Sequence, residues 1–265
     1  MTSIIFLLLG LIFGSFLNVV VYRIGVAEDI LGRSYCPKCK KKIKWYDNIP
    51  VISFIMLKFQ CRECGKKISW QYPMVEIATG ILFALVGANF FSAIDPATWM
   101  PTFYYLGIVS FLMVVLVYDF IHMEIPSTVL WAGIAWTVFF NLIFDWYSLS
   151  WSVPLESAIY SGVLAAFVSF VFFFLMVVFS REKWMGLGDA YLVIFLGMIT
   201  GWPEILLALF LAFAIGAICG IILIGMKKKK IKSQIPFAPF LALGTLITIF
   251  FYQAIVNWYF GLVAF

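Results

Sequence analysis

Two aspartates stand out among the thirteen acidic residues because they adjoin apolar runs instead of lying in polar loops. Asp119 follows the apolar run 111–118, and Asp189 follows the segment 185–188, MGLG. A carboxylate at a membrane boundary is costly unless it is paired or hydrated, so such residues commonly mark functional sites. Two aspartates that meet in a pocket of low dielectric constant share one proton, and such a pair has the chemistry for hydrolysis.

In such a dyad, the ionised carboxylate takes a proton from water as the water attacks a carbonyl carbon, while the protonated partner donates to the carbonyl oxygen. Gly186 and Gly188 have no Cβ, so a substrate backbone can approach them closely. We therefore expect Asp119 and Asp189 to be catalytic and the two glycines to bind substrate. From the Gly-x-Gly-Asp pattern alone, the alternative is that both aspartates cap helices or pair with lysines.

Four cysteines form two C-x-x-C pairs, Cys36 with Cys39 and Cys61 with Cys64, with 21 residues between the pairs. Four thiolates satisfy the tetrahedral preference of Zn²⁺ and leave no position for water, so the pattern predicts a structural zinc ion. Two disulfides are the alternative, which a reducing compartment would disfavour. The fifth cysteine, Cys219, lies within an apolar run and is expected to serve packing.

The composition places these groups in a membrane protein. The chain is 64% hydrophobic and 12% charged, whereas soluble proteins are about 45–50% apolar and about 25% charged. A membrane helix needs roughly 20 mostly apolar residues. Breaks in the apolar runs predict helices near 4–22, 74–94, 103–120, 128–147, 155–179, 189–200, 203–226 and 236–263. We expect an all-α polytopic protein with about eight transmembrane helices, the sixth of them short, and a small zinc-binding domain.

All lysines and arginines fall in three segments: eleven lie within 23–67, two are Arg181 and Lys183, and five lie within 227–232. Counting helices puts the three segments on one side of the membrane, which the positive-inside rule makes the cytoplasm. Both predicted catalytic aspartates fall on this side. The net charge of +5 is explained by topology and anionic lipid, so no nucleic-acid partner is expected.

The predicted domains are a retained first transmembrane helix at 1–22, a cytoplasmic zinc-ribbon-like domain at 23–73, and a membrane aspartyl protease core of about seven helices at 74–265. The middle segment is too short to fold around its own hydrophobic core, and domains of this size usually need a metal or disulfides. Asp145 and Glu204 fall on the opposite side of the membrane and are expected to be structural.

Short motifs along nearly the whole chain resemble those of one protein family. They are Gly10 with 14–20 and Arg23; 45–50 with Tyr72, Pro73 and Glu76; Asp119 with Ile125 and Pro126; 186–189; and 235–237 with Pro239 and Phe240. In this order they are similar to the motifs of the type IV prepilin peptidases, the Gly-x-Gly-Asp intramembrane aspartyl proteases.

The resemblance implies cleavage after a glycine at the cytoplasmic end of a substrate's hydrophobic helix, in the bacterial inner membrane. It also implies N-methylation of the new N-terminus from S-adenosylmethionine, a function associated with the cytoplasmic domain. Asp119 and Asp189 match the family's catalytic aspartates, and the four paired cysteines match its zinc ligands. Glu76 is expected to bind substrate. Prepilin or pseudopilin precursors and the lipid bilayer are the implied partners, and the sequence specifies neither the particular pilin nor an oligomeric state.

Four positions depart from the family pattern. They are Gln71, where Arg usually precedes Tyr-Pro; Ser127, where Asp usually follows Ile-Pro; Tyr191, where Lys often follows Gly-Asp; and Ala238, where Gly usually stands. Gln71 and Tyr191 replace positively charged residues of the family pattern. We expect this loss of charge to affect substrate preference or the methylation step more than peptide-bond hydrolysis. A peptidase without methyltransferase activity is therefore one alternative. A membrane carrier with intramembrane aspartates and a zinc-ribbon adaptor without chemistry are two others.

Overall fold

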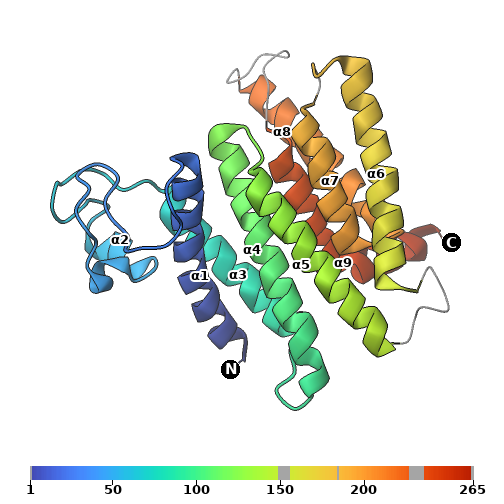
Figure 1. The fold of residues 1–265 in the computed structure, drawn as a ribbon, viewed down its shortest axis with the longest axis horizontal. Helices are drawn as coiled ribbons and strands as arrows, with labels where there is room; N and C mark the ends of the chain where they lie inside the picture. Colours follow the sequence, from blue (N-terminus) through green and yellow to red (C-terminus); the bar gives the residue numbers. More distant parts are fainter. Residues whose placement is uncertain (1, 149–155, 184, 227–235, 264–265) are drawn as a thin grey trace. The chain divides into compact units, whose positions relative to one another are not determined.

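The structure is a computed structural model that describes residues 2–148, 156–183, 185–226 and 236–263 (Figure 1). Within these ranges the chain is helical and contains no β-strand, only two isolated bridges between Tyr35 and Lys42 and between Gln60 and Lys67. The predicted all-α class is therefore confirmed. The basic run at 227–232 and residue Ile235 of the last motif lie outside the described residues.

Each of the eight predicted membrane helices has a counterpart in the structure. They are α1 (Thr2–Gly25), α3 (Gln71–Phe90), α4 (Trp99–His122), α5 (Ser127–Ser148), α6 (Ala158–Ser180), α7 (Leu187–Thr200), α8 (Glu204–Gly225) and α9 (Ala238–Val263). Among the described residues, seven of these helices are long and apolar enough to cross a membrane. The exception is α7, whose 14 residues reach about 21 Å at about 1.5 Å per residue, short of a hydrocarbon core of about 30 Å.

Three shorter helices complete the described elements: η1 (Trp45–Asn48), α2 (Ile52–Met56) and η2 (Pro96–Thr98). The chain forms two compact units, residues 1–118 and residues 119–265, so that the division falls inside α4. The first unit contains the two cysteine pairs, and the second contains both predicted catalytic aspartates.

In the first unit, α1 packs against α3 with their backbones almost in contact. A Cβ atom at Gly10 would lie 2.6 Å from the carbonyl oxygen of Thr79, and one at Gly14 would lie 2.7 Å from the Cα atom of Glu76. Small residues four positions apart permit this close approach in membrane helices. The approach brings α1 directly against the turn of α3 that carries Glu76.

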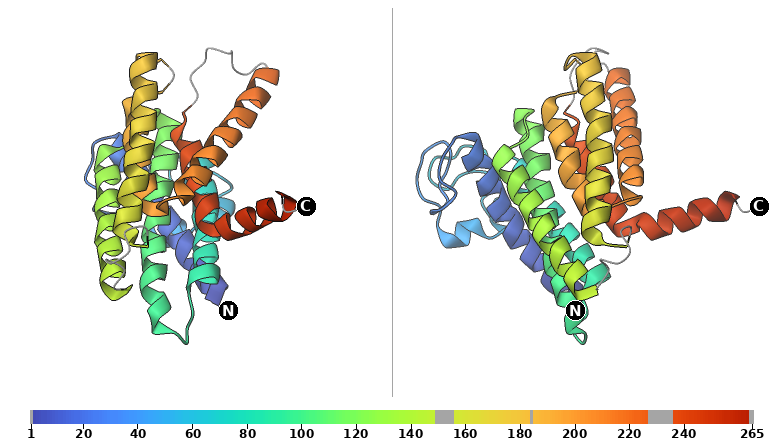
Figure 2. Two further views of the ribbon diagram at one scale, coloured as in Figure 1. Left: turned by 90° about the vertical axis from the view of Figure 1, so that its right-hand side faces the viewer. Right: turned by 45° about the vertical axis from the view of Figure 1, so that its right-hand side comes forward.

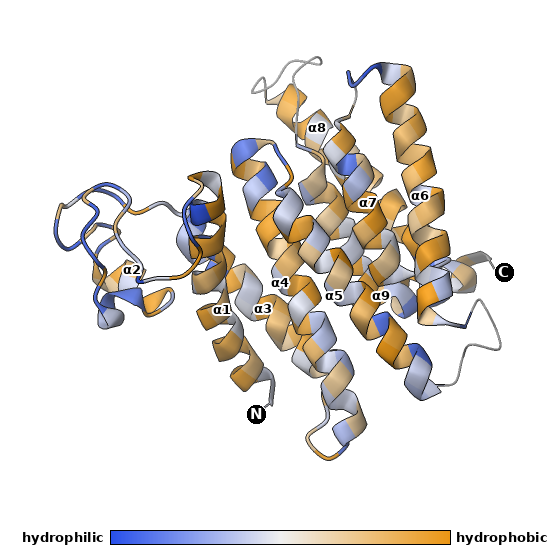
Figure 3. Ribbon diagram, in the orientation of Figure 1, coloured by the Kyte–Doolittle hydropathy of each residue, from blue (hydrophilic) through white to orange (hydrophobic). Residues whose placement is uncertain are grey.

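The segment between α1 and α3 is largely hydrophilic, in contrast to the helices on either side (Figure 3). Its first residues are held by Arg23, which lies in the last turn of α1 and is only 4% exposed. The guanidinium group of Arg23 donates to the backbone carbonyls of Asp29, Ile30 and Arg33. One buried cation thus holds the chain as it leaves the helix.

In the second unit, the short helix α7 lies among other helices: it contacts α5, α6, α8 and α9, and α6 runs alongside it (Figure 2). Leu192, Phe195 and Leu196 on α7 are completely buried. A helix too short to span the hydrocarbon is tolerated at membrane depth when protein surrounds it, because its backbone ends then meet protein groups instead of lipid.

Asp145, near the end of α5, binds the start of α6. Its carboxylate accepts hydrogen bonds from the hydroxyl of Ser157 at 2.6 Å and from the backbone N–H groups of Ala158 and Ile159 at 2.7 and 3.0 Å. The first N–H groups of a helix have no partner within the helix, so this carboxylate serves as an N-terminal cap. The geometry agrees with the structural role expected from the sequence.

The close approach of α1 and α3 makes Gly10 intolerant of a side chain. Replacing Gly10 with Leu is expected to cost about 1–3 kcal/mol of stability or more, because the backbone of α3 occupies the space that the side chain needs. Thermal unfolding of the purified protein in detergent measures the effect. The matched control is Gly220→Leu on α8, where no atom lies within 4 Å of a Cβ. Equal unfolding temperatures for the two variants would contradict the packing described.

Candidate active site and metal centre

Asp119 lies in the last turn of α4 and is only 5% exposed. Its carboxylate accepts a hydrogen bond from the backbone N–H of Ala238, the first residue of α9. The Oδ2 atom of Asp119 is buried and finds no hydrogen-bond partner among the described residues. A buried carboxylate oxygen without a donor is unfavourable, so this atom is an open acceptor for a water molecule or a substrate.

Asp189 lies in the first turn of α7, where the helix dipole favours negative charge. Its carboxylate accepts from the backbone N–H of Gly186, the residue that caps the helix, and it interacts electrostatically with Asp119. Two acidic side chains that are 70 positions apart in the sequence therefore interact electrostatically inside one compact unit.

The two glycines before Asp189 have different surroundings. The nearest atom to a Cβ at Gly186 would be the backbone nitrogen of Gly188 at 3.9 Å, so the space beside Gly186 is open. A Cβ at Gly188 would lie 3.3 Å from the Cδ1 atom of Ile125, in the turn between α4 and α5. Gly188 therefore lets this turn pack against the start of α7, while Gly186 leaves room for another chain. Their binding of substrate remains a prediction.

The four paired cysteines converge on one point. The sulfur atoms of Cys36, Cys39, Cys61 and Cys64 all lie within 4.8 Å of one another, and the sulfurs of Cys36 and Cys64 are 4.0 Å apart. A tetrahedron with Zn–S bonds of about 2.3 Å has sulfurs about 3.8 Å apart, so the set fits a Zn²⁺ ion. All five cysteines of the chain are free thiols in the structure, including Cys219.

Both cysteine pairs are built on the same tight turn. In the first, the backbone N–H of Cys36 donates to the carbonyl of Lys41, and in the second, that of Cys61 donates to the carbonyl of Lys66. Burial raises the pKa of the Cys36 thiol, but hydrogen bonds from the backbone N–H groups of Cys39 and Lys38 outweigh it and lower that pKa to about 7. Backbone donors that stabilise a thiolate are typical of zinc knuckles because the metal ligand is the thiolate.

Ion pairs join the second knuckle to the rest of the segment. The side chain of Arg62 donates from Nε and Nη2 to the carboxylate of Asp47, at 2.9 and 2.6 Å. The ammonium group of Lys41, beside the first knuckle, lies 2.7 Å from the carboxylate of Glu63 in the second. These pairs hold in register a segment that has little hydrophobic core.

Glu76, in the second turn of α3, is 7% exposed and lies in the first unit, apart in the sequence from both aspartates. Its carboxylate accepts from the backbone N–H of Val51 at 2.8 Å, and it hydrogen-bonds the side chain of Ser15 on α1. Glu76 thus joins α1, α3 and the segment between them. Its predicted role in binding substrate remains a prediction.

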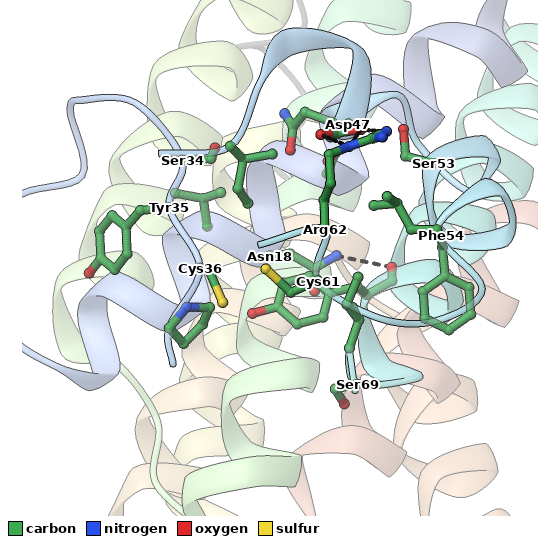
Figure 4. Close-up of a pocket in the computed structure, with 18 of the residues that line it drawn as sticks. Asn18, Ser34, Tyr35, Cys36, Asp47, Ser53, Phe54, Cys61, Arg62 and Ser69 are labelled. Carbon is green, nitrogen blue, oxygen red and sulfur yellow. Dashed lines mark hydrogen bonds and ion pairs between the residues drawn. The ribbon is translucent and has the colours of Figure 1, made fainter. Parts of the chain in front are cut away.

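A cavity of about 410 Å³ opens between the cysteine-containing segment and the adjoining turns of α1 and α3 (Figure 4). Its lining includes Asn18, Phe54, Tyr72 and Glu76, together with Cys36. The close-up in Figure 4 shows the amide of Asn18 hydrogen-bonded across to α3 and the pair formed by Arg62 and Asp47. Sequence patterns did not indicate this cavity, although Asn18 is a polar residue inside an apolar helix and so carried a signal.

Comparison with known proteins identifies the chain's relatives. Residues 8–90 match the Bacterial Peptidase A24 N-terminal domain, and residues 106–221 match the Type IV leader peptidase family. A protein of Pseudomonas aeruginosa named prepilin leader peptidase/N-methyltransferase is 30% identical over 96% of this chain and 91% of its own length. The chain belongs to the type IV leader peptidase family.

Two further relatives have the same name and also match most of the chain. Proteins with the same name from Klebsiella pneumoniae and Pseudomonas putida are 34% and 27% identical to the chain. They match over 77% and 91% of this chain, and over 87% and 88% of their own lengths. No solved structure matches the chain significantly. Family membership and the seven apolar helices of the described residues make the chain a multi-pass inner-membrane protein.

Two of the departures from the family pattern have a local explanation. Ala238 contributes its backbone N–H to Asp119, and any residue other than proline supplies that donor, so alanine in place of the family's glycine preserves the contact. Tyr191 on α7 stacks with Phe170 on α6, with ring centroids 6.2 Å apart, and is 43% exposed. An aromatic side chain therefore replaces a charge on the outer face of this helix pair.

The cysteine cluster predicts that the purified protein binds one zinc ion per chain. Replacing Cys36 with Ser is expected to reduce the bound zinc to near zero, because a closed four-sulfur site loses most of its affinity with one ligand. Metal analysis by mass spectrometry measures the content. Cys219→Ser on α8 is the control and should retain all of the zinc. Cysteines that bind no zinc and react with thiol reagents only after reduction would point to disulfides instead.

Proposed function

We propose that this chain is a prepilin leader peptidase that cuts the leaders of type IV pilin-like precursors with an aspartyl dyad, Asp119 and Asp189. The observation that supports the proposal is the electrostatic interaction between these two carboxyl groups, from α4 and α7, within one compact unit of a chain of this family. The relatives' names supply the substrate class, and the pair of acids supplies the chemistry.

In this mechanism the dyad holds one proton between two carboxyl groups, because two carboxylates that share a pocket ionise together only at high cost. The ionised member takes a proton from water as the water oxygen attacks the scissile carbonyl carbon, and the protonated member donates to the carbonyl oxygen. When the tetrahedral intermediate collapses, a proton passes to the leaving amine and the shared-proton state returns. The open Oδ2 atom of Asp119 is available to bind the attacking water.

The orientation follows from charge. All lysines and arginines fall in the three segments described above, and the helix order puts these segments on one side of the membrane, so we assign that side to the cytoplasm. Asp119 near the end of α4 and Asp189 at the start of α7 then face the cytoplasm. In this scheme, residues 23–73 are a cytoplasmic zinc-ribbon-like domain between the first helix at 1–22 and a protease core at 74–265.

The chain also carries, in this proposal, the second activity in its relatives' names, N-methylation of the new N-terminus. S-adenosylmethionine supplies the methyl group, bonded to a positively charged sulfur. The residues of the first unit fit such a donor, since the buried Oδ1 atom of Asn18 has no hydrogen-bond partner among the residues that the structure describes. A structural zinc ion held by the four cysteines supports that unit.

Replacing either catalytic aspartate with Asn is expected to lower the rate of prepilin cleavage by about 10²–10⁴-fold or more, because an amide neither accepts nor releases the shared proton. The measurement uses purified protein in detergent with a full-length prepilin, and gel electrophoresis separates precursor from mature pilin.

The matched control is Glu124→Gln, which neutralises an exposed carboxylate in the turn that follows Asp119. This variant should cleave at the wild-type rate. Asp119→Asn and Asp189→Asn variants that process prepilin normally would exclude the dyad and favour a carrier or an adaptor. Product mass with and without S-adenosylmethionine separates the bifunctional enzyme from a peptidase that has lost methylation, since only the former adds a methyl group.

A further inference from the structure

The short helix α2 (Figure 1) is apolar on both of its faces. On one face, Ser53 and Phe54 are buried within the first unit. On the other, Ile52, Ile55 and Met56 are exposed, Met56 to 76%, so the described part of the chain leaves all three largely uncovered. A helix that is apolar on every side is normally buried, either in protein or in lipid. The exposed face of α2 therefore lacks the partner that its composition requires.

Three aromatic rings connect α2 to the start of α3. Phe54, Phe59 and Trp70 pack against one another, with ring centroids 4.8, 5.1 and 5.4 Å apart. Trp70 directly precedes α3, and its backbone carbonyl accepts from the N–H of Met74. Phe59 and Trp70 are also exposed, Trp70 to 63%. We call these two rings and the exposed side chains of α2 the α2 patch: Ile52, Ile55, Met56, Phe59 and Trp70.

The lipid-facing side of α3 leads directly into the α2 patch. α3 is long and apolar enough to cross a membrane. Its exposed side chains Met74, Ile77 and Ile81 lie four, seven and eleven positions after Trp70, so these residues share one face of the helix. The opposite face packs against α1. Apolar side chains that a membrane helix exposes contact lipid, and tryptophan is enriched where such a helix reaches the membrane surface.

We propose that the α2 patch lies in the headgroup region of the bilayer and anchors the segment between α1 and α3 to the membrane surface. An exposed apolar surface marks a contact with a membrane or a protein, and continuity with the lipid-facing side of α3 favours the membrane. Lys58 directly follows α2 and has no salt-bridge partner among the described residues. A lysine beside an apolar patch suits anionic headgroups, because its stem is apolar and its end is charged. This contact with lipid does not depend on either proposed activity.

The anchor is tied to the metal centre through the backbone. The N–H of Phe59 donates to the carbonyl of Phe54 at 3.0 Å, and the carbonyl of Phe59 accepts from the N–H of Ile68 at 2.8 Å. Phe59 and Ile68 flank the second cysteine pair, Cys61 with Cys64. The segment between α1 and α3 is too short for a hydrophobic core of its own, so burial of the α2 patch in lipid adds apolar stabilisation that it lacks. Zinc and the bilayer then hold the same part of the chain.

The test uses the full-length, zinc-loaded protein in nanodiscs of phosphatidylethanolamine and phosphatidylglycerol. Part of the lipid carries an aryl diazirine near the glycerol end of an acyl chain. After illumination, peptide mass spectrometry locates the lipid adducts. In the wild type we expect adducts on residues 52–59 and 70 and on the lipid-facing side of α3. We expect none on 34–43, where every large apolar side chain is at least partly covered.

A double variant, Ile55→Glu with Met56→Glu, introduces two charges into the patch. We expect it to lower the adducts on 57–59, which it leaves unaltered, by roughly fivefold or more, because charged side chains are unfavourable in an apolar layer. Its zinc content should equal that of the wild type. The matched control is Leu31→Glu, which places a charge at an exposed apolar residue outside the patch and should keep wild-type labelling of 57–59.

A wild-type protein without lipid adducts on 52–59 would overturn the inference, and so would wild-type labelling of 57–59 in the double variant. If the double variant loses its zinc and its fold, the wild-type pattern decides alone. Adducts on 52–59 but not on 34–43 then support the anchor, and adducts confined to the membrane helices refute it. Cross-links from 52–59 to a second chain or to a prepilin, in place of lipid, would refute the lipid contact and assign this face to a protein partner.

Discussion

Buried and half-buried carboxylates in a protein that is mostly apolar helix must find donors inside the protein, and here they find them near helix starts. Asp119 accepts from Ala238 at the start of α9, Asp189 from Gly186 before α7, and Glu76 from Val51 before α2. Asp145 accepts from the first residues of α6. The N–H groups at the start of a helix have no partner within it and carry partial positive charge. One type of interaction therefore stabilises each of these acids, and for Asp119, Glu76 and Asp145 it also joins separate parts of the chain.

The degree to which each acid is satisfied separates structural from reactive positions. The carboxylate of Asp145 has three donors spread over both oxygens, which leaves it little capacity for a further ligand. Within the described part of the chain, Asp119 has an oxygen without a donor, and Glu76 has donors but no salt-bridge partner. Because an unsatisfied buried polar group costs free energy in the resting protein, it is retained where a substrate or a water molecule completes it.

The sequence alone predicted every membrane helix, because hydropathy reports directly on burial in lipid. The predicted starts of α3 and α4 were three and four residues too late, and both errors have the same cause. Pro73 and Pro101 lie in the first turn of their helices, where a proline is tolerated because the missing N–H would have had no partner. Each proline interrupts the apolar run, so the run alone places the helix start after it.

The contacts that complete the sites were harder to predict. The donor to Asp119 is the backbone N–H of Ala238. Almost every residue type has this group, so the sequence showed the motif around Ala238 but could not predict its contact with Asp119. The bond between Glu76 and Val51 joins residues 25 positions apart through a segment without periodic hydrophobicity. Cysteine spacing, by contrast, predicted that the four thiols converge, because few sites other than a zinc site require two C-x-x-C pairs.

The two proposed chemistries make different demands on the protein, and the two compact units meet them by different means. Hydrolysis by a shared-proton dyad requires two acids in an environment of low dielectric constant that still admits one water molecule, and α4, α7 and α9 surround the acids and supply backbone donors. Recognition of a soluble cationic donor requires a polar cavity, and residues 23–73 have too little apolar surface to hold one open by packing alone. Four cysteines and the ion pairs of Arg62 and Lys41 take the place of a hydrophobic core there. Loss of zinc should therefore impair methyl transfer before it impairs peptide-bond cleavage.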